Sequence, residues 1–248
     1  MNSVIYILWL RQLKRYWRSK ARMIGTLGQP ILFLVALGFG LGTVFQKAGQ
    51  GNYIEFLAPG IVAMSILFTA MFNGIEVIWD RQFGFLKETL VAPVSRLKIM
   101  IGRTLGGATV AFLQGILVLI ISLLLGFHIV NVANIPIALL FMFLIAFLFT
   151  ALGTAIASLL HDMNAFPLII NFVIMPLFFL SGALFPIDNL PSFLEIIIRV
   201  NPLSYGVDGV RGALTTSSFG LPMDFGVILA WIVVVNLIGS YLFSRIEA

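Results

Sequence analysis

The chain has 248 residues, of which 60% are hydrophobic and only 10% are charged, and its formal net charge at pH 7 is +5. Soluble domains carry about 25% charged residues, and a water-soluble fold of this size could not bury so much apolar surface. The composition therefore excludes a soluble protein and predicts an integral membrane protein. Apolar runs of about 20 residues, without alternation of period two, predict spanning helices rather than a membrane β-barrel. The absence of cysteine excludes disulfides and thiolate metal sites.

The first predicted element is an amphipathic helix at residues 1–22 that lies in the plane of the membrane interface. Basic residues at steps of three and four fall on one face, and apolar and aromatic residues fall on the other. The basic face holds Arg11, Lys14, Arg15, Arg18 and Arg22, and the opposite face holds Tyr6, Trp9, Leu13, Tyr16 and Trp17. Lys20 lies off the basic face, so the helix is expected to end near it. The alternative is an ordinary basic anchor for the next span.

Six transmembrane helices are predicted along the rest of the chain. Their approximate ranges are 23–45, 53–79, 99–127, 135–160, 165–185 and 225–243. Pro30 is expected to kink the first of them. Gly38 and Gly42, in the same span, form a small-xxx-small pair of the kind that lets helices approach closely.

The distribution of basic residues predicts the orientation of these spans. With the N-terminus inside, the inner segments hold twelve Lys and Arg residues: six at 1–22, five at 80–103, none at 161–164 and one after the last span. The outer segments hold the remaining three. Cytoplasmic loops retain positive charge, so both termini are expected on the cytoplasmic side of the plasma (inner) membrane. Orientation explains the net positive charge without a nucleic-acid partner.

Residues 80–92 are predicted to form a short amphipathic helix on the cytoplasmic side, between the second and third spans. Phe83, Leu86 and Leu90 follow steps of three and four and make a short apolar face. Pro93 is expected to end this helix, because a residue before proline avoids the α region. A push on a helix held between two spans moves both spans. This is the mechanical requirement for coupling a cytoplasmic motor to a membrane pathway.

The segment at 186–224 is predicted to contain two short helices on the outer side. Its apolar stretch is bounded by Pro191 and by Asn201-Pro202, and about ten residues cannot cross a bilayer. Two helices that dip into the outer leaflet and pack against protein fit this pattern. The alternative is a solvent-exposed loop that contains a helix.

Three motifs, with their joint spacing, resemble the permeases of ABC-2-type transporters, and most closely the group that accompanies multidrug and daunorubicin exporters. FGFLKE followed by LVAPVSRLKIMIGRTLGG, at 83–107, resembles the loop between the second and third spans of that family. YIEFLAPGIVAMSIL at 53–67 resembles the start of the second span, and GALFPIDNLPSFLEIIIRVNPLSYGVDGVRGAL at 182–214 resembles the outer re-entrant region. The resemblance covers nearly the whole chain.

The resemblance implies a single ABC transmembrane type-2 domain over residues 1–248, with an interfacial helix at 1–22, a coupling helix at 80–92 and an outer re-entrant region at 186–224. It implies a pair of permeases, as a homodimer or with a sibling chain, above two copies of a separate ATPase subunit. The coupling residues carried over from the family pattern are Phe83, Gly84, Leu86, Lys87, Glu88 and Leu90.

The chain is not expected to be an enzyme. It has no G-x-x-x-x-G-K-[ST] motif, and it therefore lacks the loop that cradles nucleotide phosphates. No cofactor is expected in this chain, and ATP and Mg would be bound by the partner ATPase. His161-Asp162 resembles an acid–base pair, but no third group accompanies it, and no H-E-x-x-H or G-x-S-x-G motif is present.

Polar residues inside the spans suggest structural contacts or a substrate path. Glu76 lies near the inner end of the second span, where a structural ion pair is expected, because an unpaired acid at mid-bilayer costs about 2.5–3.5 kcal/mol. Asn73, Phe172 and Phe179 are candidates for the translocation path, and interhelical hydrogen bonds or lipid contact are the alternatives. Gln114, Asn171 and Asn236 are expected to make interhelical hydrogen bonds. Asp208 and Arg211, three residues apart, are expected to pair as a structural clamp.

The function expected from these features is export of a lipophilic or amphipathic compound by alternating access, driven by a separate ATPase. A permease for polysaccharide or lipid-linked glycan is the first alternative. An ion-coupled secondary transporter would need ionisable residues near mid-span, which this chain lacks apart from Glu76 near one end. A membrane scaffold is the last alternative.

Overall fold

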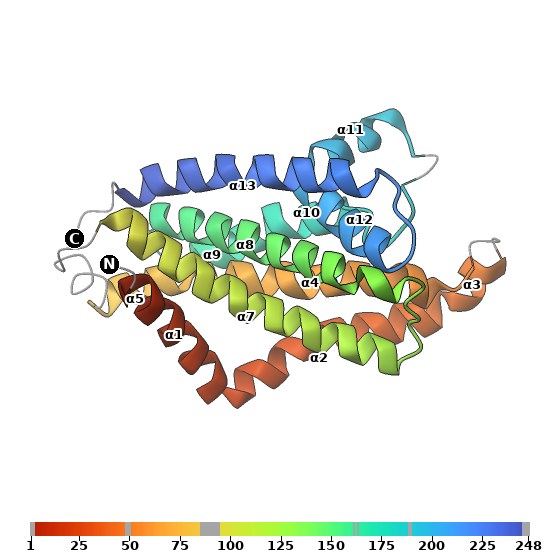
Figure 1. The fold of residues 1–248 in the computed structure, drawn as a ribbon, viewed down its shortest axis with the longest axis horizontal. Coiled ribbons are helices and arrows are strands. Elements are labelled where there is room, and N and C mark those ends of the chain that lie inside the picture. The colour runs from red at the N-terminus through yellow and green to blue at the C-terminus, as the bar shows by residue number, and fades with distance from the viewer. Residues whose placement is uncertain are drawn as a thin grey trace.

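A computed structural model describes residues 3–47, 51–84, 95–160, 162, 164–187 and 190–244. Every regular element within these residues is a helix, which confirms the predicted all-α class. Five helical stretches of this part of the chain are long and apolar enough to cross a membrane: 23–40, 53–82, 98–124, 132–159 and 221–242. The chain is therefore a multi-pass membrane protein by length and composition of its helices. Most of the helices run along one long axis (Figure 1).

The N-terminal part forms a V on the side of the bundle (Figure 1). Helix α1 (Ser3–Arg18) ends where the pattern around Lys20 predicted, and after Ser19 the chain turns into α2 (Lys20–Gly40). The first predicted span is not continuous, since α2 stops at Leu41 and a short helix α3 (Gly42–Lys47) follows. This break lies between Gly40 and Gly42, and glycine is among the poorest helix formers.

The second predicted span also consists of two helices, α4 (Tyr53–Gly74) and α5 (Glu76–Gln82). The side chain of Asn52 accepts a hydrogen bond from the Ile54 amide at 3.0 Å and so caps the start of α4. Near the break, Gly74 touches the backbone of α8: a Cβ at Gly74 would lie 2.3 Å from the carbonyl carbon of Gly153. Only glycine permits so close an approach.

Helices α4 and α8 form the centre of the bundle. Helix α4 packs against α2, α7 (Arg96–Leu124), α8 (Ile135–Leu159) and α12 (Pro202–Leu214), and nearly all of its residues are buried. Helix α8 packs in turn against α7, α12 and α13 (Leu221–Ser244), and the 3-10 turn η1 (Val132–Asn134) precedes it. The outer helices α2 and α13 expose most of their apolar side chains, as helices in contact with lipid do.

The fifth predicted span, 165–185, differs most from expectation. It consists of α9 (Ala165–Ile169), the π-helical segment η2 (Ile170–Ile174) and α10 (Met175–Phe179). At about 1.5 Å per residue this rod is about 22 Å long, shorter than a hydrocarbon core of about 30 Å. The π-helical segment lies between Pro167 and Pro176, each of which lacks the N–H that a regular helix requires.

The two short helices predicted within 186–224 are confirmed as α11 (Ser192–Val200) and α12 (Pro202–Leu214). They begin after Pro191 and after Asn201, as the pattern predicted. Helix α12 is almost wholly buried against α4, α8 and α13, whereas α11 is largely exposed. The start of α1 and the end of α13 lie at one end of the bundle, together with α5, and helices α3, α11 and α12 lie at the opposite end (Figure 1).

Candidate functional site

Helix α1 lies against α7 through a surface of small residues. A Cβ at Gly106 would lie 2.7 Å from Cγ of Gln12, and one at Gly102 would lie 3.1 Å from Cβ of Leu8. The spacing of these two glycines, four residues apart, gives one face on which α1 can approach the α7 backbone. The contact of α1 with protein therefore replaces part of the lipid contact that its apolar face was expected to make.

Two hydrogen bonds from aromatic side chains fix this contact. Trp9 Nε1 donates to Thr109 Oγ1 at 3.0 Å, and the hydroxyl of Tyr16 donates to Gln114 Oε1 at 2.5 Å. The second bond confirms that Gln114 makes an interhelical contact. Tyr6 and Trp17, on the same predicted face, are exposed. These two bonds therefore fix the orientation of α1 relative to α7.

A cluster of ionised groups joins α1, α5 and α7. Arg11 Nη2 donates to Asp80 Oδ1 at 3.0 Å, and Arg103 Nη2 donates to Asp80 Oδ2. One helical turn away, Arg15 lies 3.5 Å from Glu76 Oε2. The expected ion pair of Glu76 is therefore confirmed, with its partner on the N-terminal helix rather than in the basic loop. Asp80 and Arg103 are each only 4% exposed, so this ion pair is shielded from solvent.

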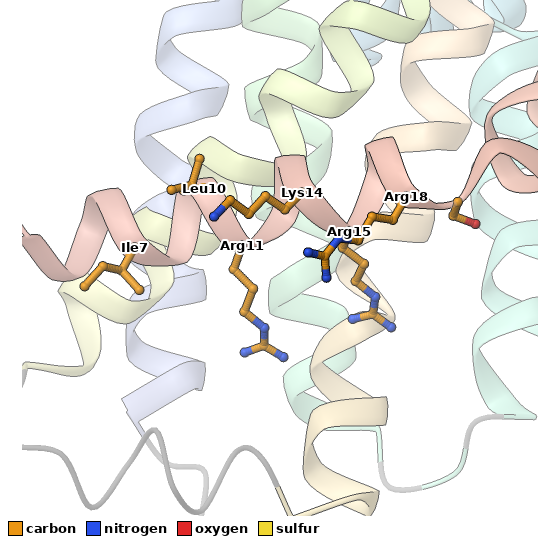
Figure 2. A pocket seen from close by; sticks show the side chains of 7 residues that line it. Ile7, Leu10, Arg11, Lys14, Arg15 and Arg18 are labelled. Carbon is orange, nitrogen blue, oxygen red and sulfur yellow. The ribbon is translucent and has the colours of Figure 1, made fainter.

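The basic face of α1 lines an open cavity of about 620 Å³. Figure 2 shows Arg11 and Arg15 extending from α1 to the side where α5 lies, in keeping with their contacts to Asp80 and Glu76. The residues that line this cavity are Ile7, Leu10, Arg11, Lys14, Arg15, Arg18 and Ser19. Lys14 and Arg18 form no ion pair with any residue that the structure describes. The predicted basic face therefore exists, and two of its cations are available to an external partner.

The predicted coupling residues lie at the edge of the described chain. Helix α5 continues through Asp80 and ends at Gln82, so a helix that starts at Asp80 is not observed. Phe83 caps α5 and is 69% exposed, and Gly84 leaves the helical path with φ of +79°. The other four predicted coupling residues, Leu86, Lys87, Glu88 and Leu90, lie outside the described residues. The break at Gly84 arises because a positive φ suits glycine.

The candidate path residues lie in different environments. Asn73 is buried and donates from Nδ2 to the carbonyl oxygen of Gly107 at 3.0 Å, so it links α4 to α7. Phe172 in η2 is 78% exposed and Phe179 in α10 is 43% exposed. Both aromatic rings therefore lie on a free apolar surface of this protomer, whereas Asn73 faces its interior.

An apolar cavity of about 550 Å³ adjoins Phe172. It lies where η2 and α10 meet α11 and α13, and its lining is almost entirely hydrocarbon: Phe172, Val173, Pro176, Leu177, Leu180, Ile196, Ile197, Val200, Asn201, Pro202 and Trp231. A cavity of this kind suits the apolar portion of an amphipathic molecule. Asn171 in the same segment is exposed, and the Asn236 amide donates to the Ile232 carbonyl oxygen of its own helix at 2.8 Å. The hydrogen bond of Asn236 is thus not the interhelical contact that we expected.

Helix α12 is held by polar side chains that bind backbone groups. Asn201 Nδ2 donates to the carbonyl oxygens of Leu177 and Leu180, at 2.7 and 3.0 Å, while its Oδ1 accepts from the Leu203 amide at 2.9 Å. These bonds attach the start of α12 to the end of α10. One side chain thereby satisfies carbonyl groups left free where α10 ends.

Asp208 and Arg211 do not pair with each other as predicted. Asp208 accepts hydrogen bonds from the Ser218 and Phe219 amides and from the Ser217 hydroxyl, at 2.8 to 3.0 Å, and so fixes the turn before α13. Arg211 donates to the Gly182 carbonyl oxygen at 3.0 Å, and its guanidinium carbon lies 4.1 Å from the centre of the Phe56 ring. Both residues have structural roles, but Asp208 binds the 217–219 turn and Arg211 binds the Gly182 carbonyl oxygen.

The sequence-based interpretation missed Asp80 and the burial of Arg103. Both were assigned to a charged cytoplasmic loop, although Asp80 belongs to α5 and Arg103 to α7. A signal was present in the spacing. Glu76 and Asp80 are four residues apart, as are Arg11 and Arg15, so two acids on one helix face can meet two bases on another.

Comparison with known proteins supplies the family. The family model described as "ABC-2 type transporter" matches residues 3–215. The chain is 28% identical to the putative transport permease ycf38 of Cyanophora paradoxa, over 98% of this chain and 88% of that protein. It is 32% identical to nodulation protein J of Rhizobium leguminosarum bv. trifolii, over 83% and 76%, respectively. It is 29% identical to the inner membrane transport permease YadH of Escherichia coli K12, over 96% and 93%.

Proposed function

Because the chain belongs to the ABC-2 type transporter family, as a membrane permease that has no ATPase activity and no cofactor of its own, we propose that it exports a lipophilic or amphipathic compound. Permeases of this family pair with a separate ABC ATPase subunit, which binds the ATP. In the proposed assembly, two copies of this chain stand above two copies of the ATPase, and transport proceeds by alternating access.

The observation that carries the proposal is the combination, at one end of the bundle, of a basic surface and the start of a connecting segment. The cavity under α1 presents Lys14 and Arg18, and α5 ends nearby with the exposed ring of Phe83. We assign this end to the cytoplasm, with both termini inside, because basic residues are retained there. The ATPase would receive the segment from Phe83 to Leu90, with Gly84, Leu86, Lys87 and Glu88, and would contact the basic face of α1.

The proposed cargo follows from the exposed aromatic surface. Phe172 and Phe179 are exposed on the segment with the π-helical insertion, and the adjoining cavity is lined by apolar groups. Such a surface favours a molecule with a hydrocarbon portion over a bare polysaccharide, which needs hydrogen-bonding groups along its path. In a pair of permeases, these two rings would line the path between the copies. Asn73, buried against Gly107, would act there as a helix contact that the movement rearranges.

We further propose that the segment from α9 to α10 is the fifth of six spans, completed on the outer side by α11 and α12. The rod itself is short, but Asn201 attaches α12 to its outer end. Helix α12 is covered by protein, which permits helices that dip into the outer leaflet without exposing polar backbone to lipid.

The test is reconstitution of the chain with its cognate ATPase in proteoliposomes. Three probes are offered: the lipophilic dye rhodamine 6G, a fluorescently labelled short-chain phospholipid and a labelled oligosaccharide. We expect ATP-dependent movement of at least one of the first two probes and none of the oligosaccharide. The variant Leu86→Asp plus Glu88→Lys should abolish ATP-dependent transport and weaken co-purification with the ATPase. Transport of the oligosaccharide alone would favour the glycan alternative, and an unchanged complex with unchanged transport in the variant would refute the coupling role.

A further inference from the structure

One carboxylate, that of Asp80, connects three helices. Its Oδ1 accepts a hydrogen bond from Arg11 of α1 at 3.0 Å, and its Oδ2 accepts one from Arg103 of α7. Asp80 itself lies in the last turn of α5, which ends at Gln82. We call these three residues the Asp80 junction.

The position of the junction along the chain matters more than its strength. The chain leaves α5 after Gln82 and begins α7 at Arg96, so the segment between these residues is attached to α5 at one end and to α7 at the other. The Asp80–Arg103 pair joins the last turn of α5 to a residue about two turns into α7. A displacement of the segment that moves either helix is therefore transmitted to the other through this ion pair.

Two ion pairs, one helical turn apart, attach helix α1 to α5. Arg11 and Arg15 meet Asp80 and Glu76, respectively, so the two helices run in opposite directions where they meet. On its other side, α1 lies on Gly102 and Gly106 of α7. A movement of α5 consequently reaches α1 through ionised groups and through close packing.

Burial makes the junction resistant to separation. Asp80 and Arg103 are each 4% exposed, and in this environment a charge without its partner is strongly unfavourable. Within the described part of the chain, Nε and Nη1 of Arg103 have no hydrogen-bond acceptor, so Asp80 supplies the acceptor on which Arg103 depends. The junction can rotate as a body, but it cannot open cheaply.

We propose that Asp80 is a positioning residue that converts displacement of the segment between α5 and α7 into a joint movement of α1, α5 and α7. This inference rests on the proposed function. Without the junction, the ATPase would still bind and hydrolyse ATP, but α1 and α7 would no longer follow α5. The expected defect is loss of coupling rather than loss of assembly.

The first experiment separates coupling from folding by removing one charge or both. Asp80→Asn leaves the buried Arg103 without its carboxylate partner, and Arg103→Gln leaves Asp80 with only the half-exposed Arg11, so both variants should lower the thermal midpoint of the complex. The double variant removes both buried charges, so its midpoint should return close to that of the wild type. Transport of rhodamine 6G per ATP hydrolysed should nevertheless stay at least about fivefold below the wild-type ratio, at the lower end of typical coupling between sites. The matched control, Glu195→Gln plus Arg199→Gln, removes the exposed pair on α11 and should leave this ratio unchanged.

A second variant keeps the test decisive if the buried variants fold poorly. Arg11→Gln leaves the Asp80–Arg103 pair intact and detaches only the half-exposed side of the junction. The native chain has no cysteine, so spin labels at introduced cysteines, Trp17→Cys on α1 and Leu237→Cys on α13, report only on these exposed sites. ATP should change the distance between the labels in the otherwise native complex, and Arg11→Gln should reduce that change.

Each outcome bears on the inference. A wild-type transport ratio in the double variant, or an undiminished ATP-driven distance change in Arg11→Gln, would overturn it. Failure of the wild-type complex to couple any transport to ATP would instead refute the proposed function, whatever the junction variants do.

Discussion

The two ends of the bundle are held together by different kinds of contact. At the end with α5, side chains of opposite charge meet across α1, α5 and α7. At the other end, Asn201, Asp208 and Arg211 bind backbone groups of turns and helix ends. Contacts between side chains can persist while whole helices rotate. Contacts to backbone groups fix the local path of the chain, so we infer that the first end transmits movement and the second keeps its shape.

The largest effect should come from Asp80→Leu, which breaks the first kind of contact. Removing one partner of a buried ion pair leaves Arg103 uncompensated and should lower the free energy of unfolding by about 3–5 kcal/mol. Thermal or denaturant unfolding of the purified protein in detergent measures this. The control is Glu195→Leu, which breaks an exposed pair and should cost less than about 1 kcal/mol. Equal losses in the two variants would remove the distinction between buried and exposed charges.

The second effect tests the backbone contacts at the other end. Asn201→Ala removes the cap of α12 and both bonds to the end of α10, and we expect a loss of about 2–3 kcal/mol. Asn131→Ala is the matched control, because Asn131 precedes η1 without a side-chain capping bond and is exposed. Limited proteolysis should also cut the 180–200 region faster in Asn201→Ala. Comparable stability of the two alanine variants would contradict the role of Asn201 as the attachment point.

These two variants also mark what the sequence could predict. Helix boundaries followed from local chemistry: Lys20 off the basic face, and the Pro191 and Asn201-Pro202 limits of α11 and α12, predicted ends that the structure confirms. Period and composition likewise predicted the basic face of α1. Such features depend on residues that are neighbours along the chain.

The partners of charged residues were not predictable in the same way. Asp80 meets Arg11 across 69 positions of sequence, and the choice of Arg103 over other nearby basic residues depends on how α5 packs on α7. Asp208 and Arg211 were predicted to pair because they share a helix face, yet the Gly182 carbonyl and the 217–219 turn compete for them. The π-helical segment lies between two prolines, and no single-residue rule gives their combined effect on a partly exposed helix.

A third, intermediate effect concerns the close packing of α1 on α7. Gly106→Ala places a methyl group 2.7 Å from Gln12 Cγ and 3.3 Å from Trp9 Cα, so α1 must shift, at a cost of about 1–3 kcal/mol. Gly28→Ala in α2 meets no atom within 4 Å and should instead stabilise the helix by up to about 1 kcal/mol. The comparison is read from unfolding midpoints and from the rate at which trypsin cuts at the basic residues of α1. Faster cutting in Gly28→Ala than in Gly106→Ala would argue against close packing as the support of α1.

The smallest effect should come from Asp224, a buried acid in the first turn of α13. Its carboxyl group is fully buried and interacts with the Asp208 carboxylate. Asp224→Asn keeps the shape of the side chain and offers an amide that can donate to Asp208 at any pH, so stability should rise by up to about 1 kcal/mol. Asp208→Asn, the control, removes an acceptor from the 217–219 turn and should lower stability. If Asp224→Asn were destabilising instead, the carboxyl group would have to gain a favourable contact in the native protein, and the end with α11 and α12 would then depend on an ionisable side chain as the end with α5 does.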